Sequence, residues 1–318
     1  MTVAGFASLR WIDDQRPLIE PRGLSPLVAD PSFLFPEETP DGRWRLYAHT
    51  AFGIHAFVSG DGLAWRDLGM VVANAMRSFI RRFPDGYRLY CEKYRPLAIP
   101  LQLLPRRPRW SSRIEVRRSL DLSSWGPPRT LVEPVLPWQQ DERLGRSVGN
   151  PCLVQDGGRW LLYFSASLAF VPDCGFDEPR FIGLATSASP DGPFTVAPTP
   201  VVDPADDPLP GVIGAGSMKV VRAEDGFVAL QNKIHRDGTG RSRSALFLLR
   251  STDGSRWEPA ASAPLLAPGT GWRRSHVYAC DARFRESERR WYLYYNARDG
   301  WYKTEGRERI GRLHAGPF

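Results

Sequence analysis

The sequence lacks the features that mark several other protein classes. No apolar stretch reaches the length of about 18 residues that a membrane-spanning helix needs. The first ten residues have no basic start, apolar stretch or small-residue cleavage site of the kind found in secretory signals. Four widely spaced cysteines (Cys91, Cys152, Cys174 and Cys280) show no metal-ligand spacing. These absences predict a cytoplasmic protein with no membrane partner.

Lysine is scarce, because only four of the 42 basic residues are lysines and arginine carries most of the formal net charge of +7. A basic chain raises nucleic acid as a partner. The arginines are spread along the sequence, however, and the one dense run, residues 105–109, is short. We therefore expect no nucleic-acid partner. Where guanidinium groups do gather, we expect them to bind carboxylates or phosphates.

What the sequence does contain is an internal repeat. Five times, an apolar strand leads through a turn into a second strand rich in Trp, Tyr and Leu. The paired segments are 30–35 with 44–47, 77–80 with 87–90, 150–154 with 160–163, 217–221 with 227–230, and 276–280 with 291–294. Two of the turns read Pro-Asp-Gly, at 40–42 and 84–86, which is typical of a hairpin. The 29 glycines, 29 prolines and 12% aromatic residues also favour many short strands.

A second recurring feature closes four of these units. A turn rich in Ser, Asp and Gly ends in an aromatic residue at Trp65, Trp125, Phe194 and Trp257, in steps of 60, 69 and 63 residues. Four strands in roughly 65 residues, repeated five times, indicate an all-β, five-bladed β-propeller with four antiparallel strands per blade. The prediction is one domain over 1–318, with blades at about 28–70, 75–126, 146–195, 214–258 and 273–318. We expect residues 11–19 to help close the ring.

Three segments depart from the repeat: 95–113 in blade two, 168–180 in blade three and 298–309 in blade five. Long loops on a rigid scaffold often carry specificity, and variable surface is the alternative interpretation.

A pocket is predicted where the first strand of each blade begins and the second ends. The strand starts carry Asp30, Arg77, Asn150, Ser217 and His276, and the equivalent positions of the second strands carry His49, Glu92, Ser165, Asn232 and Asn296. All ten are polar although their strands are otherwise largely apolar. Solvated strand ends explain some of this pattern but not all ten positions, so we expect a ligand site there.

The stretch Asp30-Pro31-Ser32-Phe33, the Gly-aromatic-Tyr hairpins and the Gly-Pro-Phe at 192–194 resemble the five-bladed glycoside hydrolases of family 43, the arabinanases and xylosidases, and their sucrase relatives. The resemblance covers nearly the whole chain in short motifs. It implies an enzyme acting on a glycosidic bond, with Asp30 as general base or nucleophile. His276 fits the histidine common in the last blade of that family.

The carboxylate set departs from that family. Its members carry a glutamic acid opening blade three and an aspartate opening blade two, where this chain has Asn150 and Arg77. Neither side chain can donate a proton as a carboxylic acid with a raised pKa does. Glu92 is the candidate acid. The alternative is a salt bridge from Glu92 to a nearby cation such as Arg77, which would lower the pKa of Glu92.

A basic set offers a different function. The residues that could surround the pocket are Arg77, Arg146, Lys219, Lys233, His235, Arg274, His276 and Arg298. Such donors suit a phosphate or carboxylate, and in residue type they resemble the propeller mannoside phosphorylases. A transferase, phosphorylase or biosynthetic enzyme acting on an anionic sugar derivative is therefore one alternative. A propeller that binds a small carbohydrate without turning it over is another.

Metal binding is the last possibility to weigh. His49, His235 and His276, with Asp30 and Glu92, belong to different blades and have no local ligand spacing. We expect no cofactor and no catalytic metal, and an ion in the channel remains an open alternative.

Overall fold

The computed structural model describes residues 1–102, 104 and 107–318 and confirms an all-β chain. Its helices are short: α1 (Val3–Ala7), α2 (Ala98–Leu101) and five single 3₁₀ turns (Pro36–Glu38, Pro137–Gln139, Pro204–Asp206, Gly271–Arg273 and Glu286–Glu288). In these described residues, no helix has the length and apolar character needed to cross a membrane.

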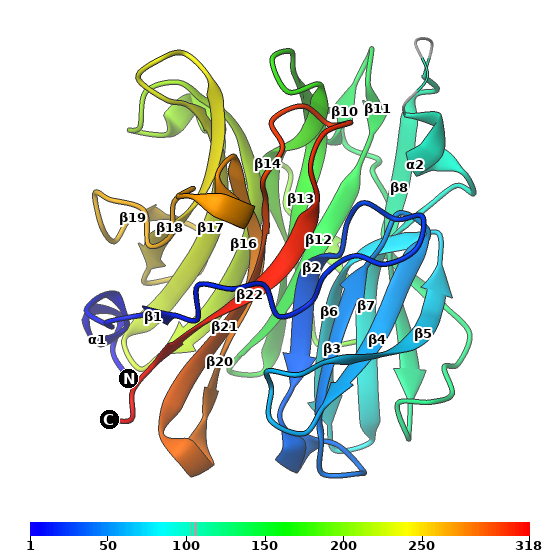
Figure 1. The fold of residues 1–318 in the computed structure, drawn as a ribbon, viewed down its shortest axis with the longest axis vertical. Helices are drawn as coiled ribbons and strands as arrows, with labels where there is room; N and C mark the ends of the chain where they lie inside the picture. Colours follow the sequence, from blue (N-terminus) through cyan, green and yellow to red (C-terminus); the bar gives the residue numbers. More distant parts are fainter. Residues whose placement is uncertain (103, 105–106) are drawn as a thin grey trace.

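Consecutive strands pair antiparallel in sets of four, which we call units one to five (Figure 1). Unit one contains β2 (Ala29–Leu34), β3 (Trp44–His49), β4 (Gly53–Ser59) and β5 (Arg66–Ala73). Unit two contains β6 (Ala75–Phe83), β7 (Gly86–Tyr94), β8 (Trp110–Ser119) and β9 (Arg129–Val132). Unit three contains β12 (Val148–Asp156), β13 (Arg159–Val171), β14 (Phe176–Ser187) and β15 (Thr195–Val196). Unit four contains β16 (Val212–Ala223), β17 (Gly226–Arg236), β18 (Ser242–Ser251) and β19 (Glu258–Pro259). A ribbon of β10 (Gln140–Asp141) and β11 (Gly145–Arg146) extends the edge of β8.

Unit five is built from both ends of the chain. It contains β20 (His276–Arg285), β21 (Arg290–Arg298), β22 (Glu308–Ala315) and the N-terminal β1 (Ile12–Asp13), which pairs antiparallel with β22. Arg312 Nε donates to Asp14 Oδ2 at 2.7 Å beside this pairing. The two chain ends therefore lie next to each other (Figure 1), and the segment expected to help closure completes the last unit.

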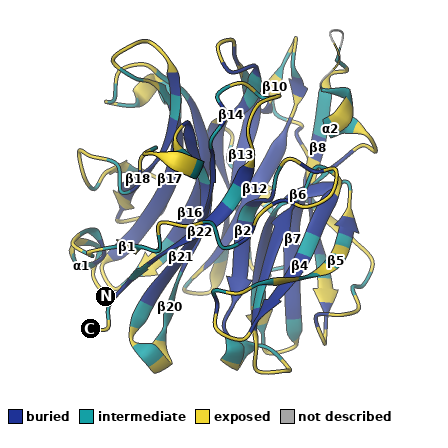
Figure 2. Ribbon diagram, viewed as in Figure 1, coloured by how far each residue is buried: buried dark blue, intermediate teal, exposed yellow. Residues whose placement is uncertain are grey.

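The first strands of the units form the centre of the molecule. β2 packs against β6, β6 against β12, β12 against β16, β16 against β20, and β20 against β2. These strands are mostly buried, and the exposed residues gather in the turns around them (Figure 2). Because each strand is covered by a neighbouring unit on both faces, its central residues are buried without alternation, and they include polar ones such as Ser32 and Asp281.

Neighbouring units are joined by tyrosines that reach from a second strand into the next unit's turn. Trp65, Trp125 and Trp257 of the recurring turns pack edge-on against such tyrosines, with ring centroids 5.7 to 5.9 Å apart. Three hydroxyls also donate to a turn carbonyl: Tyr90 to Pro190 (3.0 Å), Tyr163 to Gly254 (2.7 Å) and Tyr294 to Gly62 (2.7 Å). The aromatic turn that marks the repeat in the sequence is thus one half of a joint between units.

The joint between units four and five is different. Leu230 stands where the other units have tyrosine, and unit five lacks the aromatic turn. Instead, Ser244 of β18 pairs in parallel with His276 of β20, and Asn232 Nδ2 donates to the carbonyl of Val277 at 3.0 Å. Backbone pairing replaces the tyrosine contact here and merges the two units into one eight-stranded sheet.

A buried carboxylate ties three of the central strands together. Asp281 of β20 is 1% exposed and accepts hydrogen bonds from Ser32 Oγ of β2 at 2.8 Å and from both terminal nitrogens of Arg81 of β6, at 2.9 and 2.8 Å. Burial alone would raise the pKa of Asp281, but the Arg81 guanidinium outweighs that effect, so the pKa lies below its usual value. Asp281 therefore stays ionised and fixes β2, β6 and β20 relative to one another.

Replacing this carboxylate should destabilise the fold. We expect Asp281→Ala to lower the free energy of unfolding by about 3–5 kcal/mol in urea at pH 7, because the partly buried Arg81 would lose its counter-charge and Ser32 its acceptor. The lowered pKa means that the stabilisation exists above the unfolded pKa of about 3.9 and disappears as the pH falls through the folded pKa. The gap between variant and parent should therefore narrow below about pH 4.

The matched control is Asp41→Ala, which removes an exposed partner of Arg45. It should cost less than about 1 kcal/mol. Equal losses in the two variants would contradict the role assigned to Asp281.

Candidate functional site

A repeated β-bulge turns three polar side chains toward the centre of the molecule. In units one, two and three, the pairing of the first two strands skips two residues at the same place. The first skipped residues are Asp30, Arg77 and Asn150, and their φ angles are 52°, 57° and 50°. Residues other than glycine rarely adopt this left-handed backbone conformation, and such backbone strain concentrates at functional sites. The bulge re-aims each side chain out of the strand's packing.

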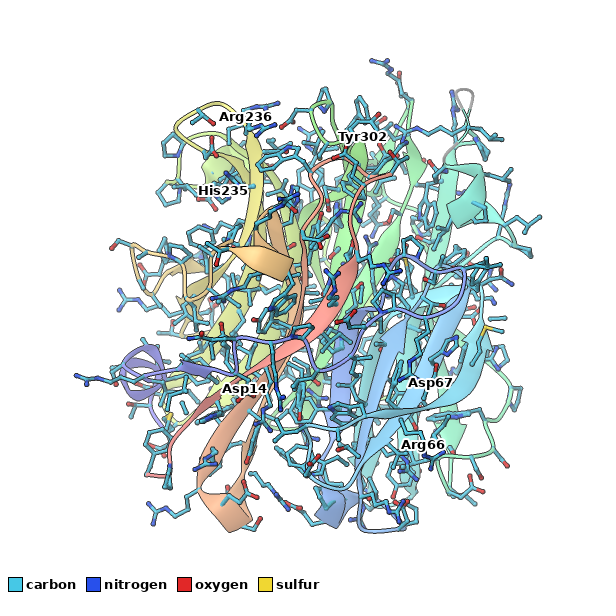
Figure 3. All side chains as sticks on the ribbon, viewed as in Figure 1. Asp14, Arg66, Asp67, His235, Arg236 and Tyr302 are labelled. Carbon is cyan, nitrogen blue, oxygen red and sulfur yellow. The ribbon has the colours of Figure 1, made fainter. Side chains whose placement is uncertain are left out.

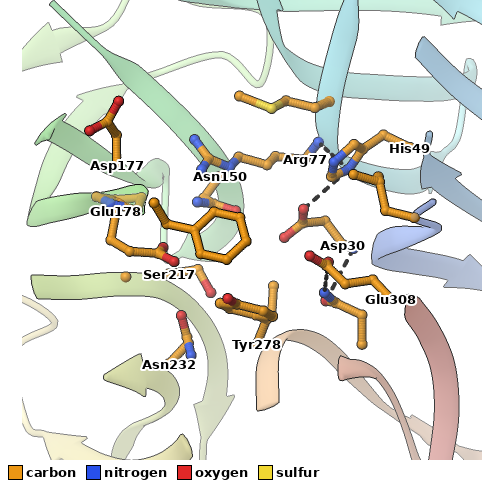
Figure 4. Close-up of a pocket in the computed structure, with 17 residues that line it drawn as sticks. Asp30, His49, Arg77, Asn150, Asp177, Glu178, Ser217, Asn232, Tyr278 and Glu308 are labelled. Carbon is orange, nitrogen blue, oxygen red and sulfur yellow. Dashed lines mark hydrogen bonds and ion pairs between the residues drawn. The ribbon is translucent and has the colours of Figure 1, made fainter. Parts of the chain in front are cut away.

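These side chains line a central cavity of about 140 Å³ (Figure 4). Seven of the ten positions predicted from the strand ends are among its lining residues: Asp30, His49, Arg77, Asn150, Ser217, Asn232 and Asn296. They come from units one to five, so every unit contributes to the predicted pocket.

Asp30 is held in an ionised state. His49 Nδ1 lies 3.1 Å from Asp30 Oδ2, and the Asp30 backbone N–H donates to Asn296 Oδ1 at 3.2 Å. Burial pushes the pKa of Asp30 upward, but the hydrogen bond and charge of His49, with the charge of Arg77, bring it below its ordinary value. The cavity therefore contains one carboxylate that can act as a base or a nucleophile.

Glu178 of β14 is the most important residue that the sequence analysis did not identify. It lines the cavity, its side chain is buried, and burial raises its pKa to about 7. Arg77 lowers this pKa, and the nearby Glu308 and Asp30 raise it further. A carboxyl group with this pKa still holds its proton in a large share of molecules at neutral pH, as a general acid must.

Glu308 of β22 is a third cavity carboxylate. Asn296 Nδ2 donates to Glu308 Oε2 at 3.0 Å, and Arg298 Nη1 lies 3.3 Å from Oε1. Burial raises its pKa, and Arg298 partly offsets that effect. Asn296 contacts both Asp30 and Glu308, so it couples the positions of two carboxylates.

Both missed glutamates lie in segments that depart from the repeat. Glu178 falls within 168–180 and Glu308 within 298–309. The first segment is no loose loop, because β13 and β14 stay paired out to Val171 and Phe176, and this longer hairpin carries Glu178 over the cavity. The departures of these segments from the repeat could have indicated that they carry site residues, although they did not indicate which side chain would point into the cavity. Leu103, Pro105 and Arg106 of the remaining segment, 95–113, lie outside the described residues.

Glu92, the acid candidate from the sequence, is placed away from the cavity lining. It is 0% exposed, and its Oε2 accepts a hydrogen bond from Arg77 Nη1 at 2.7 Å. Trp110 Nε1 donates to its other oxygen at 3.2 Å. This is the salt bridge that the sequence left open as the alternative, and it positions Arg77 at the cavity wall. Ser165 is also buried outside the lining, where its Oγ donates to the Gly216 carbonyl at 2.6 Å.

His276 does not line the cavity either, which corrects the position assigned to it. The bulge of β20 falls between Val277 and Cys280, so Tyr278 and Ala279 take the lining positions. The His276 ring stacks on Tyr278 with centroids 5.5 Å apart, and burial lowers its pKa to about 3. Counting from the start of β20 misplaced the site by two residues, because β20 begins two residues before its bulge, as β6 and β12 do, and the position equivalent to Arg77 and Asn150 is therefore Tyr278.

The basic set does not assemble into an anion site. Of its eight members, only Arg77 lines the cavity, and Arg298 lies at the wider opening. The others are elsewhere: Arg146 and Arg274 are exposed, Lys219 Nζ donates to the Pro151 carbonyl (2.7 Å), Lys233 pairs with Asp207 (2.6 Å), and His235 lies near the end of β17 beside Arg236 (Figure 3). The residue types suit an anion, but their side chains have other partners or point elsewhere.

The three histidines considered as metal ligands also lie apart, and only His49 reaches the cavity. Among residues 1–102, 104 and 107–318, no group of three or more His, Cys, Asp or Glu side chains is arranged to hold a metal ion.

No protein-family model and no curated protein matches the sequence. Solved structures do share its fold. The catalytic domain of a GH62 α-L-arabinofuranosidase from Coprinopsis cinerea has a TM-score of 0.63 at 15% identity, over 97% of this chain and 98% of that one. A family 117 glycoside hydrolase from Zobellia galactanivorans scores 0.60 at 16% identity, over 96% and 90%. An N-acetylgalactosamine deacetylase from F. plautii, in complex with blood group B trisaccharide, scores 0.63 at 14% identity, over 95% of both chains.

Identities this low show a shared fold alone. At that level, the predicted resemblance to the propeller glycoside hydrolases is confirmed.

The close packing behind the cavity makes Gly149 intolerant of a side chain. A Cβ at this position would lie 1.7 Å from Glu92 Oε2. Gly149→Ala should therefore displace Glu92 from Arg77 and lower the free energy of unfolding by about 2–4 kcal/mol, measured by urea denaturation. Gly158→Ala is the control, because a Cβ there meets nothing within 4 Å, and it should change stability by less than about 0.5 kcal/mol. If both glycines tolerate alanine equally, the Glu92 packing described above is incorrect.

Proposed function

We propose that this protein is a carbohydrate-active enzyme that hydrolyses a glycosidic bond in the central cavity of a five-bladed β-propeller. The five four-stranded units would be its blades, forming one domain over 1–318. The observation that carries the proposal is the pair of cavity carboxylates with opposite pKa shifts, Asp30 lowered and Glu178 raised to about 7. Two carboxyl groups whose environments separate their pKa values are the basis of glycoside hydrolysis.

In this proposal Glu178 is the general acid and Asp30 the general base. Glu178 gives its proton to the glycosidic oxygen as the bond from that oxygen to the anomeric carbon breaks. A water molecule adds to the anomeric carbon and passes a proton to Asp30, while His49 holds the Asp30 carboxylate in place. The products are the free sugar and an alcohol, and a later proton exchange with solvent restores both carboxyl groups.

The remaining lining suits a neutral, hydroxyl-rich ligand. Asn150 Oδ1 and the Tyr278 hydroxyl are buried and have no hydrogen-bond partner among the described residues, so a ligand hydroxyl would satisfy them. Ser217 and Asn232 add further polar groups to the wall. Arg77, the one guanidinium that the described residues place in the cavity lining, is already paired with Glu92, which supports a sugar over an anionic substrate. Structures that share this fold include the GH62 α-L-arabinofuranosidase and the deacetylase in complex with a trisaccharide, which also supports a sugar ligand.

The pH dependence should follow the two carboxyl groups. We expect kcat/KM on aryl glycosides to fall as the pH rises through about 7, because Glu178 then loses the proton it must donate. It should also fall at pH values below the ordinary range of aspartate, where Asp30 becomes protonated. Glu178→Gln should lower kcat by about 10²–10⁴-fold on substrates with poor leaving groups and remove the fall near pH 7. The exposed Glu133→Gln is the control and should keep the parent profile.

Leaving-group dependence separates the two roles. With a good leaving group such as 2,4-dinitrophenol, protonation is not needed, so Glu178→Gln should regain most of its activity. Asp30→Asn should stay inactive on the same substrate, because activation of water is lost in every case.

A panel of aryl pentosides and hexosides tests the function itself. If sugars raise the melting temperature but no glycoside in the panel is hydrolysed, the protein binds sugar without turning it over and the proposal fails.

A further inference from the structure

The cavity opens into a second, larger space that the proposed chemistry does not use. This outer pocket has a volume of about 380 Å³ and shares His49, Arg77 and Phe176 with the cavity wall. A ligand anchored in the cavity of about 140 Å³ can therefore extend into the outer pocket past these residues. The cavity has room for about one sugar ring, so the bond to be cleaved would lie at this boundary.

The wall of the outer pocket is apolar. Its side chains include Phe52, Met76, Ile99, Pro100 and Leu168, which come from three different units. Phe52 is 47% exposed, so its ring is available to a ligand in the outer pocket. Burying such surface is favourable only for an occupant that is itself apolar.

The charged side chains of the outer pocket already have partners. Arg107 Nη1 lies 2.6 Å from Asp177 Oδ2. Arg298 pairs with Glu308 and donates to the carbonyl oxygens of Tyr302 and Lys303, both at 2.9 Å. A second sugar ring would need unpaired polar groups for its hydroxyls, and these side chains are committed elsewhere.

The same contacts hold the walls of the outer pocket in place without a ligand. The Arg107–Asp177 pair joins segment 95–113 to segment 168–180, and Lys303 Nζ donates to the carbonyl of Gln102 at 3.1 Å, which joins 298–309 to 95–113. All three departures from the repeat thus meet around one opening. A pocket assembled before the ligand arrives loses less free energy to ordering on binding.

We propose that the group leaving the sugar is an apolar aglycone, an alkyl or aryl group that fills the outer pocket. The substrate class is then an amphipathic glycoside, and an oligosaccharide is disfavoured because the charged side chains that the structure describes in the outer pocket already have protein partners. This inference rests on the proposed function, because it assigns the sugar to the cavity and the aglycone to the outer pocket.

The test is a series of methyl, butyl and octyl glycosides of one sugar, assayed below the critical micelle concentration. The sugar is that of the aryl glycoside that is hydrolysed or, if none is, the sugar that raises the melting temperature most. We expect kcat/KM to rise about two- to fourfold for each methylene until the pocket is full. The disaccharide of the same sugar should be hydrolysed more slowly than the octyl glycoside. A flat series, or a preference for the disaccharide, overturns the inference.

A pair of variants localises the effect. Phe52→Ser should lower the octyl-to-methyl ratio of kcat/KM about five- to tenfold, because it removes apolar surface from the outer pocket. Leu68→Ser, on β5 of the same unit, removes a side chain of similar exposure (45%) outside the pocket and should leave the ratio unchanged. Equal octyl-to-methyl ratios of kcat/KM in the two variants would place the alkyl group of the glycoside elsewhere on the surface.

Binding to Asp30→Asn, measured by calorimetry, separates this inference from the proposed function. If no glycoside is hydrolysed but the octyl glycoside binds more tightly than the methyl glycoside, the proposed function fails and the apolar subsite stands. If hydrolysis occurs and affinity does not change with chain length, the aglycone assignment fails alone.

Discussion

The buried contact of Asp281 with Arg81 and Ser32 is the constraint on which the site depends. It joins β20, β2 and β6, and each of these strands places a cavity residue within a few positions of the contact: Tyr278, Asp30 and Arg77. A charge buried this deeply is tolerated only with its counter-charge in place, so the three strands have one acceptable arrangement. The geometry of the cavity therefore depends on an ion pair behind it as well as on the residues that line it.

The two key carboxyl groups show how one cavity can produce opposite acidities. Burial raises the pKa of both. Asp30 is in contact with His49, whose hydrogen bond and charge outweigh that effect. Glu178 lies opposite with other carboxylates around it, and burial dominates. The difference comes from the partners of each group, and the left-handed backbone at Asp30 is what brings its side chain to His49.

Much of the fold could be predicted from the sequence, because paired strands, turn residues and an approximate period are all local patterns. Asp30, His49 and Asn150 could be placed for the same reason, since they occupy equivalent positions in repeated strands. His276 could not, because the bulge position of β20 carries Tyr278, an aromatic residue that does not stand out as polar in an otherwise apolar strand. Glu178 was missed because its position depends on how far a hairpin stays paired, which is decided by contacts outside that hairpin. The basic residues show a further limit of prediction from sequence, because the charge of a side chain does not reveal which group it pairs with in the fold.

The tyrosine joints change how the repeat is best counted. A tyrosine in one unit and the aromatic turn in the next form a single contact, and at the one place where the tyrosine is replaced by Leu230, the turn that would receive it is missing as well. The two absences concern the same junction. The tyrosine of one unit and the aromatic turn of the next are therefore kept or lost together. A repeating module defined by this junction begins in the middle of one unit and ends in the middle of the next. A substitution in the tyrosine strand then constrains which residues are tolerated in the neighbouring turn.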